Sequence, residues 1–592
     1  MTISPSTVLM TIRKISDNSR LLILSVLVGI CSGGAAVLLQ TLIRLIQKAC
    51  AAVSVCTGNS SIVYFLFPAL GMLVSGLIVR YFVRDNIGHG VTKVLESISR
   101  GESRIRKHNI WSSQITSAVT IGMGGSVGAE APIVYTGAAI GSNLGKWFGL
   151  NLRSMTILVG CGAAGAVAGI FKAPLAGVLF TLEILMFNIS ATSLMPLLLS
   201  TVSATVVAYV FMGNATPFSC VLAPFNIANI PFYIVLGVVS GLFSIYFQRT
   251  TLWIEDKFAK FRSPFLRWIV CGLSLGLLIM LLPPLFGEGY SSVGELLNGG
   301  RVNFDRTTPL SFLLDSAWGV PAFFAIVLVL KVFAMTFTNA GGGVGGTFGP
   351  TLFVGAIGGF VVSRSLNLLL VSSSIVLPEQ NFVLAGMAAA MAGVMKAPMT
   401  AIFLIAEITG GYQLFIPLII ASSTSFLVSG ISEKYSIYTK RLAQSGDLIT
   451  HDNDRAAMLM MRTSDLIRDK YPRMQRKATL RQLVDTISDS SAAVIAVLDS
   501  KGRFVGLVDI GNVRKYIFRT EEYDTLRVMD LMEQAPATVQ ENERIEEVMR
   551  KFDSTQAWRL PVLRADGRYL GFISRSRILA AYREKLKEFS EE

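Results

Sequence analysis

Charged residues are scarce in this chain of 592 residues: they make up 16% of it, against about 25% in a typical soluble protein. Hydrophobic residues make up 52%, and the mean hydropathy is +0.55. A water-soluble core cannot hide this much apolar surface, so lipid must solvate part of the chain. The composition excludes an ordinary soluble enzyme, and also a disordered or fibrous protein.

Residues that build metal centres and disulfide frameworks are also few. The sequence has six cysteines and three histidines, no CxxC pair and no His/Cys cluster, so we expect neither a metal site nor a disulfide framework. We also expect no phosphate-binding loop. Gly341, Gly343 and Gly346 have the GxGxxG spacing of a dinucleotide-binding loop, but they lie between apolar segments and no βαβ unit follows them. We therefore expect no required cofactor and no enzymatic activity.

The few charges are unevenly distributed. Residues 1–439 hold 41 charged side chains, whereas residues 440–592 hold 51 and have no cysteine. The difference in charge predicts a membrane body followed by a water-soluble tail. The absence of cysteine from the tail is compatible with a reducing compartment. The net charge of +14 divides into +11 in the body and +3 in the tail. Basic residues in a membrane protein usually mark cytoplasmic loops, so we expect no nucleic-acid partner.

Basic side chains precede the first apolar run. Arg13, Lys14 and Arg20 come before residues 21–39, a run without a convincing signal-peptide cleavage site, which therefore predicts a spanning helix. By the positive-inside rule, the N-terminal segment 1–20 lies in the cytoplasm. We expect a multi-pass protein of the cell (plasma or inner) membrane, with the tail in the cytoplasm as well.

The body contains an internal repeat. Residues 162–184 and 386–408 agree at 10 of 23 positions when they are aligned with a shift of 224. A Gly-rich break that ends in proline precedes each copy: GGSVGAEAP at 124–132 and GGGVGGTFGP at 341–350. The pattern predicts a mainly α-helical body of two repeated halves with broken helices. We expect the halves to be inverted relative to each other, as repeats in transporters often are.

Each Gly-rich break is a candidate half of an anion path. Glycine lets the backbone turn, and a helix that begins just after the break has unpaired N–H groups with partial positive charge. In hydrocarbon these groups need a partner, and a bare anion can be that partner. Tight helix packing is the alternative reason for such glycines, although it explains two matched breaks less well.

Glu130 lies within the first break, where a carboxylate at membrane depth is costly and marks a functional candidate. Its charged form would compete with an anion for the same N–H groups, whereas its protonated form would not. One side chain could therefore act as both gate and proton carrier. The structural alternative is a carboxylate that binds the amides at a helix end.

The ordered motifs of the body resemble those of the CLC family of chloride channels and chloride/proton antiporters, and the resemblance extends over about residues 21–587. GAEAP at Gly128–Pro132 matches the family's GxExP pattern, and GTFGP at Gly346–Pro350 matches its GxFxP pattern. The segment EITGGYQLFIP at Glu407–Pro417 is close to the family consensus. The resemblance implies the CLC fold and a homodimer with one pore in each subunit.

The resemblance also assigns roles to individual residues. Glu130 takes the position of the family's external gating glutamate. Anion binding is assigned to the glycines of the two motifs, to the first amides after the second break and to the pore tyrosine: Gly128, Gly346, Thr347, Phe348 and Tyr438.

Two positions depart from the family pattern. His89 replaces the serine that usually coordinates the central anion, and its ring could bind the anion and make transport pH-sensitive, or point away and pack. Ile184 replaces the internal proton-accepting glutamate. That loss is common among channels of the family and also occurs in some antiporters. It therefore favours passive conduction and leaves coupled exchange open.

The tail contains a second repeat, in which VLDSKGRFVGLVD at Val497–Asp509 matches VLRADGRYLGFIS at Val562–Ser574 with a shift of 65. Each copy predicts two strands around a glycine turn and then a helix, and the pair resembles a CBS domain pair that regulates transport or stabilises a dimer. The positions that hold a ribose in such pairs lack the usual aspartate, so binding of an adenine nucleotide is left open. The candidate ligand positions are Asp509, Asn512, Ser574 and Arg577.

The sequence therefore predicts a CLC-type transporter of chloride or a similar small anion, gated by Glu130. A passive channel is favoured, and a chloride/proton antiporter is the alternative. A membrane scaffold whose CBS pair senses a ligand, without ion flux, is a remoter hypothesis. We expect the following segments: 1–20 (N-terminal), 21–439 (membrane domain, with halves about 21–215 and 230–439), 440–462 (linker), 463–520 (CBS module 1) and 528–587 (CBS module 2).

Overall fold

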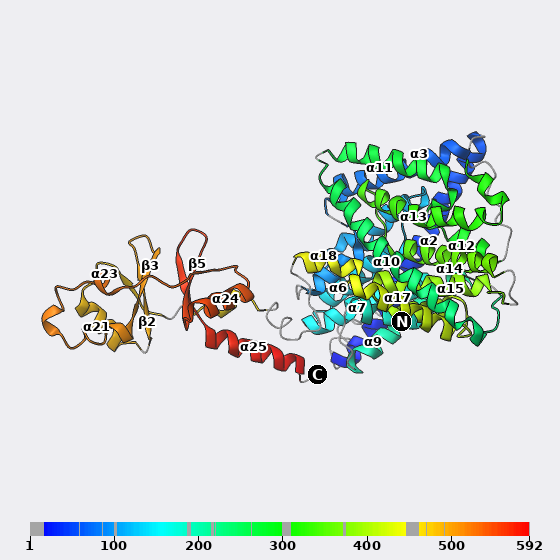
Figure 1. The fold of residues 1–592 in the computed structure, drawn as a ribbon. Helices are drawn as coiled ribbons and strands as arrows, with labels where there is room; N and C mark the ends of the chain where they lie inside the picture. The colour runs from blue at the N-terminus through cyan, green and yellow to red at the C-terminus, as the bar shows by residue number, and fades with distance from the viewer. Residues whose placement is uncertain are drawn as a thin grey trace, which may run out of the picture. The chain divides into compact units, whose positions relative to one another are not determined.

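The computed structural model divides into two compact units, Met1–Leu448 and Ile449–Glu592, and each is described here by itself (Figure 1). The division falls within the linker expected at 440–462. Residues 1–16 of the N-terminal segment and 446–460 of the linker lie outside the described residues. The structure describes residues 17–590 with gaps at 58–59, 86, 100–102, 186–190, 215–217, 219–220, 262, 299–308, 371–374, 446–460, 469–470 and 491.

The first unit is helical, and its helices form two successive sets in the same order. The first set is α2 (Asp17–Thr57), α3 (Ser60–Leu77), α4 (Gly90–Ser99), α5 (Ser112–Gly122), α6 (Glu130–Trp147), α7 (Leu152–Phe171), α8 (Pro174–Ile184) and α9 (Ala191–Met212). The second set is α10 (Ile230–Ala259), α11 (Pro264–Leu281), α12 (Tyr290–Leu297), α13 (Gly319–Ala340), α14 (Phe348–Leu369), α15 (Glu379–Met395), α16 (Pro398–Ile408) and α17 (Phe415–Ser432), and α18 (Ile437–Ser445) follows.

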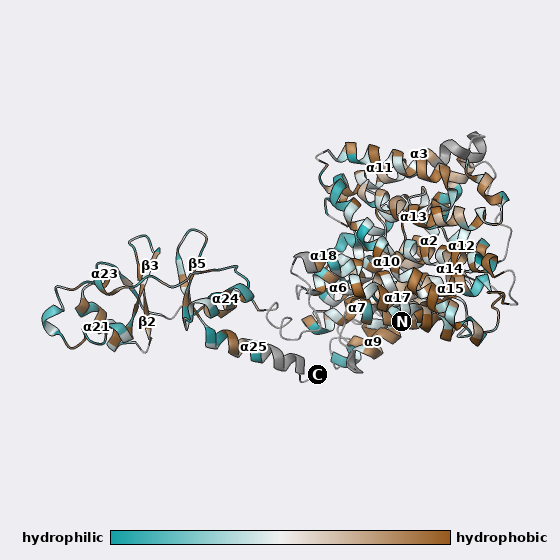
Figure 2. Ribbon diagram, viewed as in Figure 1, coloured by the Kyte–Doolittle hydropathy of each residue, from teal (hydrophilic) through white to brown (hydrophobic). Residues whose placement is uncertain are grey.

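The helices of this unit carry the apolar surface that lipid must cover. Within the described residues, nine helices are long and apolar enough to cross a membrane. Figure 2 shows hydrophobic residues along most of these helices, and large apolar side chains such as Leu45, Val210, Leu427 and Ile431 are exposed. The multi-pass body expected from the composition is confirmed.

Equivalent helices pack in the same way within each half. In the first half, α2, α7 and α9 pack against one another, and α6 packs along α7. In the second half, α10, α15 and α17 do the same, and α14 packs along α15. The repeat read from the sequence is therefore a repeat of tertiary structure.

The two Gly-rich breaks have the same backbone conformation and contact each other. Gly124 and Gly342, at equivalent positions, have φ of 100° and 102°, a region that L side chains rarely adopt. Gly128 and Gly346 exchange two backbone hydrogen bonds as an antiparallel bridge, with N···O distances of 3.0 and 2.7 Å. Equivalent segments that run antiparallel where they meet are expected of inverted halves, in agreement with the prediction.

Each break is also fixed by a threonine of the other half. The Ser126 amide donates a hydrogen bond to Thr338 Oγ1, and the Val344 amide donates one to Thr120 Oγ1, both at 3.1 Å. Both threonines are fully buried. A buried amide without a partner costs about 1–3 kcal/mol, so these reciprocal bonds stabilise irregular backbone that would otherwise be unfavourable inside a membrane.

The helices after the repeats exchange carboxylate caps. Glu407 of α16 accepts hydrogen bonds from two amides in the first turn of α8, at 3.0 and 2.9 Å. Glu183 of α8 accepts hydrogen bonds from two amides in the first turn of α16, at 3.0 and 2.6 Å. A carboxylate at a helix N-terminus satisfies free N–H groups and the helix dipole. The two glutamates therefore hold α8 and α16 together.

The second unit contains two three-stranded sheets with the same topology. In each sheet the first two strands are parallel and the last two antiparallel, in the orders β1-β2-β3 and β4-β5-β6. The elements of the first module are α20 (Thr463–Leu466), β1 (Arg473–Gln475), α21 (Leu480–Ser488), β2 (Val494–Leu498), β3 (Phe504–Asp509) and α22 (Ile510–Val513). Those of the second are α23 (Val528–Leu531), β4 (Val539–Gln540), α24 (Ile545–Thr555), β5 (Arg559–Leu563), β6 (Tyr569–Ser574) and α25 (Arg575–Ser590).

The first segment of each module crosses to the other module. Arg468 pairs with Phe572 of β6, and Glu533 pairs with Leu507 of β3. Leu466 belongs to the apolar core of the second module. The start of the tail, which the repeat pattern assigns to the first module, thus packs against the second.

Candidate functional site

Glu130 is the first residue of α6, and 2% of it is exposed. Its Oε1 accepts a hydrogen bond from the Tyr290 hydroxyl at 2.6 Å, and its Oε2 accepts one from the Gly349 amide at 3.1 Å. Gly349 lies in the first turn of α14, which begins within the second Gly-rich break. The carboxylate of one half therefore occupies an amide group at a helix N-terminus of the other half, where an anion would be favoured.

This close approach requires glycine on both sides of the carboxylate. A Cβ atom at Gly128 would overlap the Glu130 carboxylate and lie 2.9 Å from the Gly349 nitrogen. A Cβ atom at Gly349 would lie 3.0 Å from Glu130 Oε1. At Gly346, a Cβ atom would lie 2.8 Å from that of Ala131. The glycines of both motifs thus make room for the bound carboxylate and for the contact between the breaks.

Thr347, Phe348 and Tyr438 lie together at the start of α14. Thr347 precedes the helix and Phe348 is its first residue, so their amides have no partner within the helix. The Thr347 hydroxyl donates a hydrogen bond to the Tyr438 hydroxyl at 3.2 Å, and both residues are buried. The Phe348 ring packs against Phe171 and Phe180, with centroids 5.6 and 6.1 Å apart. The geometry suits anion binding by these groups, which stays a prediction.

Replacing Tyr438 by Phe should weaken chloride binding about fivefold, because a neutral hydrogen bond contributes about 1 kcal/mol. Isothermal titration calorimetry of the purified protein with chloride measures this change. Tyr412→Phe is the matched control, since 52% of Tyr412 is exposed. Unchanged chloride affinity in the Tyr438 variant would remove the hydroxyl from the proposed set of ligands.

His89 directly precedes α4. Its backbone has φ of 55°, and its Nε2 lies 3.7 Å from Glu255 Oε1 on α10. The ring therefore faces a carboxylate. Both alternatives left open by the sequence, anion binding by the ring and packing away from the anion, stay predictions.

Ile184 ends α8 and is 2% exposed. Its side chain carries no group that can bind a proton. The neighbouring Glu183 is a cap of α16, and its two carboxylate oxygens are occupied by the amides described above and by the Thr400 hydroxyl, at 2.6 Å. The structure thus places no proton acceptor at position 184 itself.

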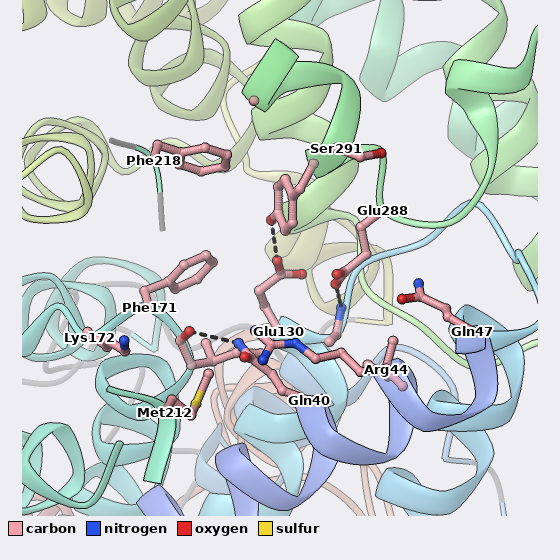
Figure 3. A pocket seen from close by; sticks show the side chains of 15 residues that line it. Gln40, Arg44, Gln47, Glu130, Phe171, Lys172, Met212, Phe218, Glu288 and Ser291 are labelled. Carbon is pink, nitrogen blue, oxygen red and sulfur yellow. Dashed lines mark hydrogen bonds between the residues drawn. The ribbon is translucent and has the colours of Figure 1, made fainter. Parts of the chain in front are cut away.

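A cavity of about 470 Å³, which we call the Glu130 pocket, leads to the carboxylate (Figure 3). Glu130, Glu288 and Tyr290 line it together with the cationic side chains of Arg44 and Lys172. Figure 3 shows the two glutamates on the same side of the pocket, with Phe171 and Phe218 across from them. Cations in a narrow opening raise the local concentration of anions.

Three residues near the Glu130 pocket were missed by sequence reasoning: Tyr290, Glu288 and Lys331. Tyr290 binds Glu130, Glu288 binds the Ala129 amide, and Lys331 is fully buried in α13. A signal existed for the two charged residues, because each is a lone charge next to or within an apolar stretch. Nothing in the local sequence marks Tyr290.

The side chains at three of the candidate ligand positions of the tail form hydrogen bonds with other groups of the protein. Asp509 accepts a hydrogen bond from the amide two residues on, at 2.8 Å, and Ser574 accepts one from the Arg577 amide, at 3.3 Å. Asn512 donates to Glu533 at 2.7 Å. Asp509 and Ser574 thus cap the helix after the last strand of each module, and binding of an adenine nucleotide stays an open hypothesis. Within the described residues, no group of three or more His, Cys, Asp or Glu side chains could hold a metal ion.

Each of the two units contains a region that matches a model of a known protein family. A family model described as voltage gated chloride channel matches residues 70–430, and a CBS domain model matches residues 528–584. The putative chloride channel protein ClcB-like of Ralstonia nicotianae is 29% identical over 390 residues, which cover 64% of this chain and 86% of that protein. The H(+)/Cl(−) exchange transporter ClcA of Vibrio cholerae is 27% identical over 394 residues, covering 64% and 78%. The structure of a slow cyanobacterial Cl−/H+ antiporter superposes with a TM-score of 0.63 at 22% identity, covering 72% of this chain and 97% of that one.

Proposed function

This chain belongs to the voltage-gated chloride channel family, whose model matches more than half of its residues, and on that basis we propose that it carries chloride or a similar small anion under the control of Glu130. The family transports anions. The further assignments concern this chain's own residues: the anion path runs between the two Gly-rich breaks, and the Glu130 carboxylate closes it.

The observation that carries the proposal is the hydrogen bond between the Gly349 amide and Glu130 Oε2. An amide at a helix N-terminus that binds a carboxylate oxygen can bind a halide by the same electrostatic attraction. The carboxylate and the anion then exclude each other. Protonation of Glu130 weakens its hold on the amide, because a neutral carboxyl is a poorer acceptor than a charged one. Anion passage therefore becomes easier as the pH falls.

A passive channel is the favoured mode of transport, because Ile184 offers no proton acceptor at the position where the family has one. A chloride/proton antiporter is the second candidate. It is supported by the relatives named as exchange transporters or antiporters, and by the second carboxylate, Glu288, in the Glu130 pocket.

The proposal includes the oligomeric state of the chain and its orientation in the membrane. The chain acts as a homodimer in the cell membrane, with a pore in each subunit. Its N-terminus and CBS pair are in the cytoplasm, where the pair regulates transport or stabilises the dimer. Size-exclusion chromatography with light scattering tests the dimer, and a monomer at all concentrations would contradict it.

Reconstituted flux separates the two modes of transport. Purified protein is placed in vesicles with a chloride gradient, and the reversal potential is measured with and without a pH gradient. A passive channel gives the chloride equilibrium potential at every pH gradient, whereas an antiporter shifts it with the pH gradient. The absence of any anion flux from a folded preparation would contradict both modes and revive a scaffold role for the CBS pair.

A further inference from the structure

Glu288 occupies an amide of the first Gly-rich break. It lies between α11 and α12, and its Oε1 accepts a hydrogen bond from the Ala129 amide at 2.9 Å. Ala129 directly precedes α6, and 1% of it is exposed. Figure 3 shows this bond beside the one between Glu130 and Tyr290. The two breaks thus each have one amide bound by a carboxylate: Gly349 by Glu130, and Ala129 by Glu288.

Lys331 fixes the segment that carries Glu288. Its ammonium group donates hydrogen bonds to Ser126 Oγ at 2.8 Å, to the Gly287 carbonyl at 3.0 Å and to the Glu288 carbonyl at 3.5 Å. Ser126 belongs to the first break, so the lysine joins that break to the loop before α12. A fully buried ammonium group needs nearby negative charge, and Glu288 interacts electrostatically with it. The position of Glu288 is therefore built into the core.

The two carboxylates act on each other. Glu130 and Glu288 line one pocket and repel each other when both are ionised. In a site of low dielectric constant, such a pair tends to retain a proton, and the loss of protons from one group depends on the state of the other. The Tyr290 hydroxyl of α12 donates a hydrogen bond to Glu130 and lines the same pocket.

We propose that Glu288 is a second proton-binding gate of the anion path, which holds the Ala129 amide until it takes up a proton. The proton comes from water in the Glu130 pocket, and the released amide then binds the incoming anion. This inference rests on the proposed function and extends it from one titrating carboxylate to two. The path opens fully only when both Glu130 and Glu288 are neutral or displaced.

The charged and titratable groups around Glu288 come from five elements. Glu130 of α6 and Tyr290 of α12 face it across the pocket, and Lys331 of α13 approaches from the core. Arg44 of α2 and Lys172, at the end of α7, line the same pocket. The negative neighbour favours protonation of Glu288, and the cations oppose it. The balance is therefore sensitive to the charge of Glu130.

Replacing Glu288 by Gln tests the proposal, because glutamine keeps the acceptor for the Ala129 amide and removes the charge. Anion flux into vesicles is measured over a range of pH, with the same pH on both sides. Flux of the unmodified protein should rise toward acid pH with a Hill slope above one. In the variant the slope falls to about one, and the midpoint moves to higher pH, because only Glu130 must then be neutral before the path opens.

Glu295→Gln is the matched control, since Glu295 is on the same helix α12 and is exposed. It should leave slope and midpoint unchanged. A Glu288→Gln profile equal to that of the unmodified protein overturns the second gate while leaving the proposed transport intact. Should a Glu288 variant fail to fold, Glu288→Asp, which keeps the charge but shortens the reach to the amide, should retain the steep profile with a changed midpoint.

A binding measurement separates failure of this inference from failure of the proposed function. If none of the proteins carries anion flux, the proposed function fails. Protons taken up on chloride binding are then counted by calorimetry in two buffers with different heats of ionisation. Uptake should be smaller in Glu288→Gln than in the unmodified protein. Equal uptake would overturn the role of Glu288, whether or not flux is present.

Discussion

Replacing Glu130 by Gln is expected to raise anion flux at neutral pH by about tenfold or more, because a hydrogen bond to a charged group contributes about 1.5–3 kcal/mol. The variant keeps the shape of the side chain and loses the charge that competes with the anion for the Gly349 amide. The pH dependence becomes shallower, because only Glu288 still has to take up a proton. Flux into vesicles over a range of pH measures both effects.

The exposed Glu295→Gln variant serves as the control for the loss of a negative charge. It should behave as the unmodified protein does. The double variant of Glu130 and Glu288 to Gln should conduct at the same rate at every pH. Flux that keeps the full pH dependence in Glu130→Gln would contradict the role of this carboxylate as the gate.

Replacing Gly128 by Ala is expected to have a similarly large effect through geometry alone. The new methyl group would overlap the Glu130 carboxylate and crowd the Gly349 nitrogen at 2.9 Å. Overpacking of a well-packed core costs about 1–3 kcal/mol, which is comparable to the energy that holds the carboxylate in place. The side chain is therefore displaced, and flux at neutral pH rises toward its value at acid pH.

Gly34→Ala is the matched control, because no atom lies within 4 Å of a Cβ atom built at Gly34. If Gly128→Ala reduces the yield of folded protein, the double variant with Glu130→Ala removes the overlapping side chain and should restore it. Unaltered gating in folded Gly128→Ala would mean that the carboxylate does not occupy the position beside Gly128.

The local sequence was sufficient to predict those parts of the site that are formed by residues close together in the chain. The Gly-rich breaks, the helices that start after them and the position of Glu130 follow from glycine, proline and a lone carboxylate in sequence order. The sequence also matched the two Gly-rich breaks that contain Gly128 and Gly346. Their antiparallel bridge is the spatial form of that match.

Contacts between distant segments could not be predicted in this way. Tyr290 and Lys331 come from α12 and α13, far along the chain from the first break, and only the packing of α13 brings Lys331 to Ser126. The direction of the His89 ring depends on Glu255 of α10. In the tail, the segment that contains Arg468 crosses to the second module because β6 offers it a pairing edge. A repeat pattern carries no information about such a crossing.

The central claim is that Glu130 and the transported anion use the same amide of Gly349. Bromide, which scatters X-rays anomalously, is soaked into crystals of the unmodified protein and of Glu130→Gln at neutral pH. We expect a bromide peak at the Gly349 amide in the variant, and the Glu130 carboxylate in its place in the unmodified protein. A bromide bound at that amide while Glu130 keeps its hydrogen bond, or no bromide there in the variant, would contradict the account.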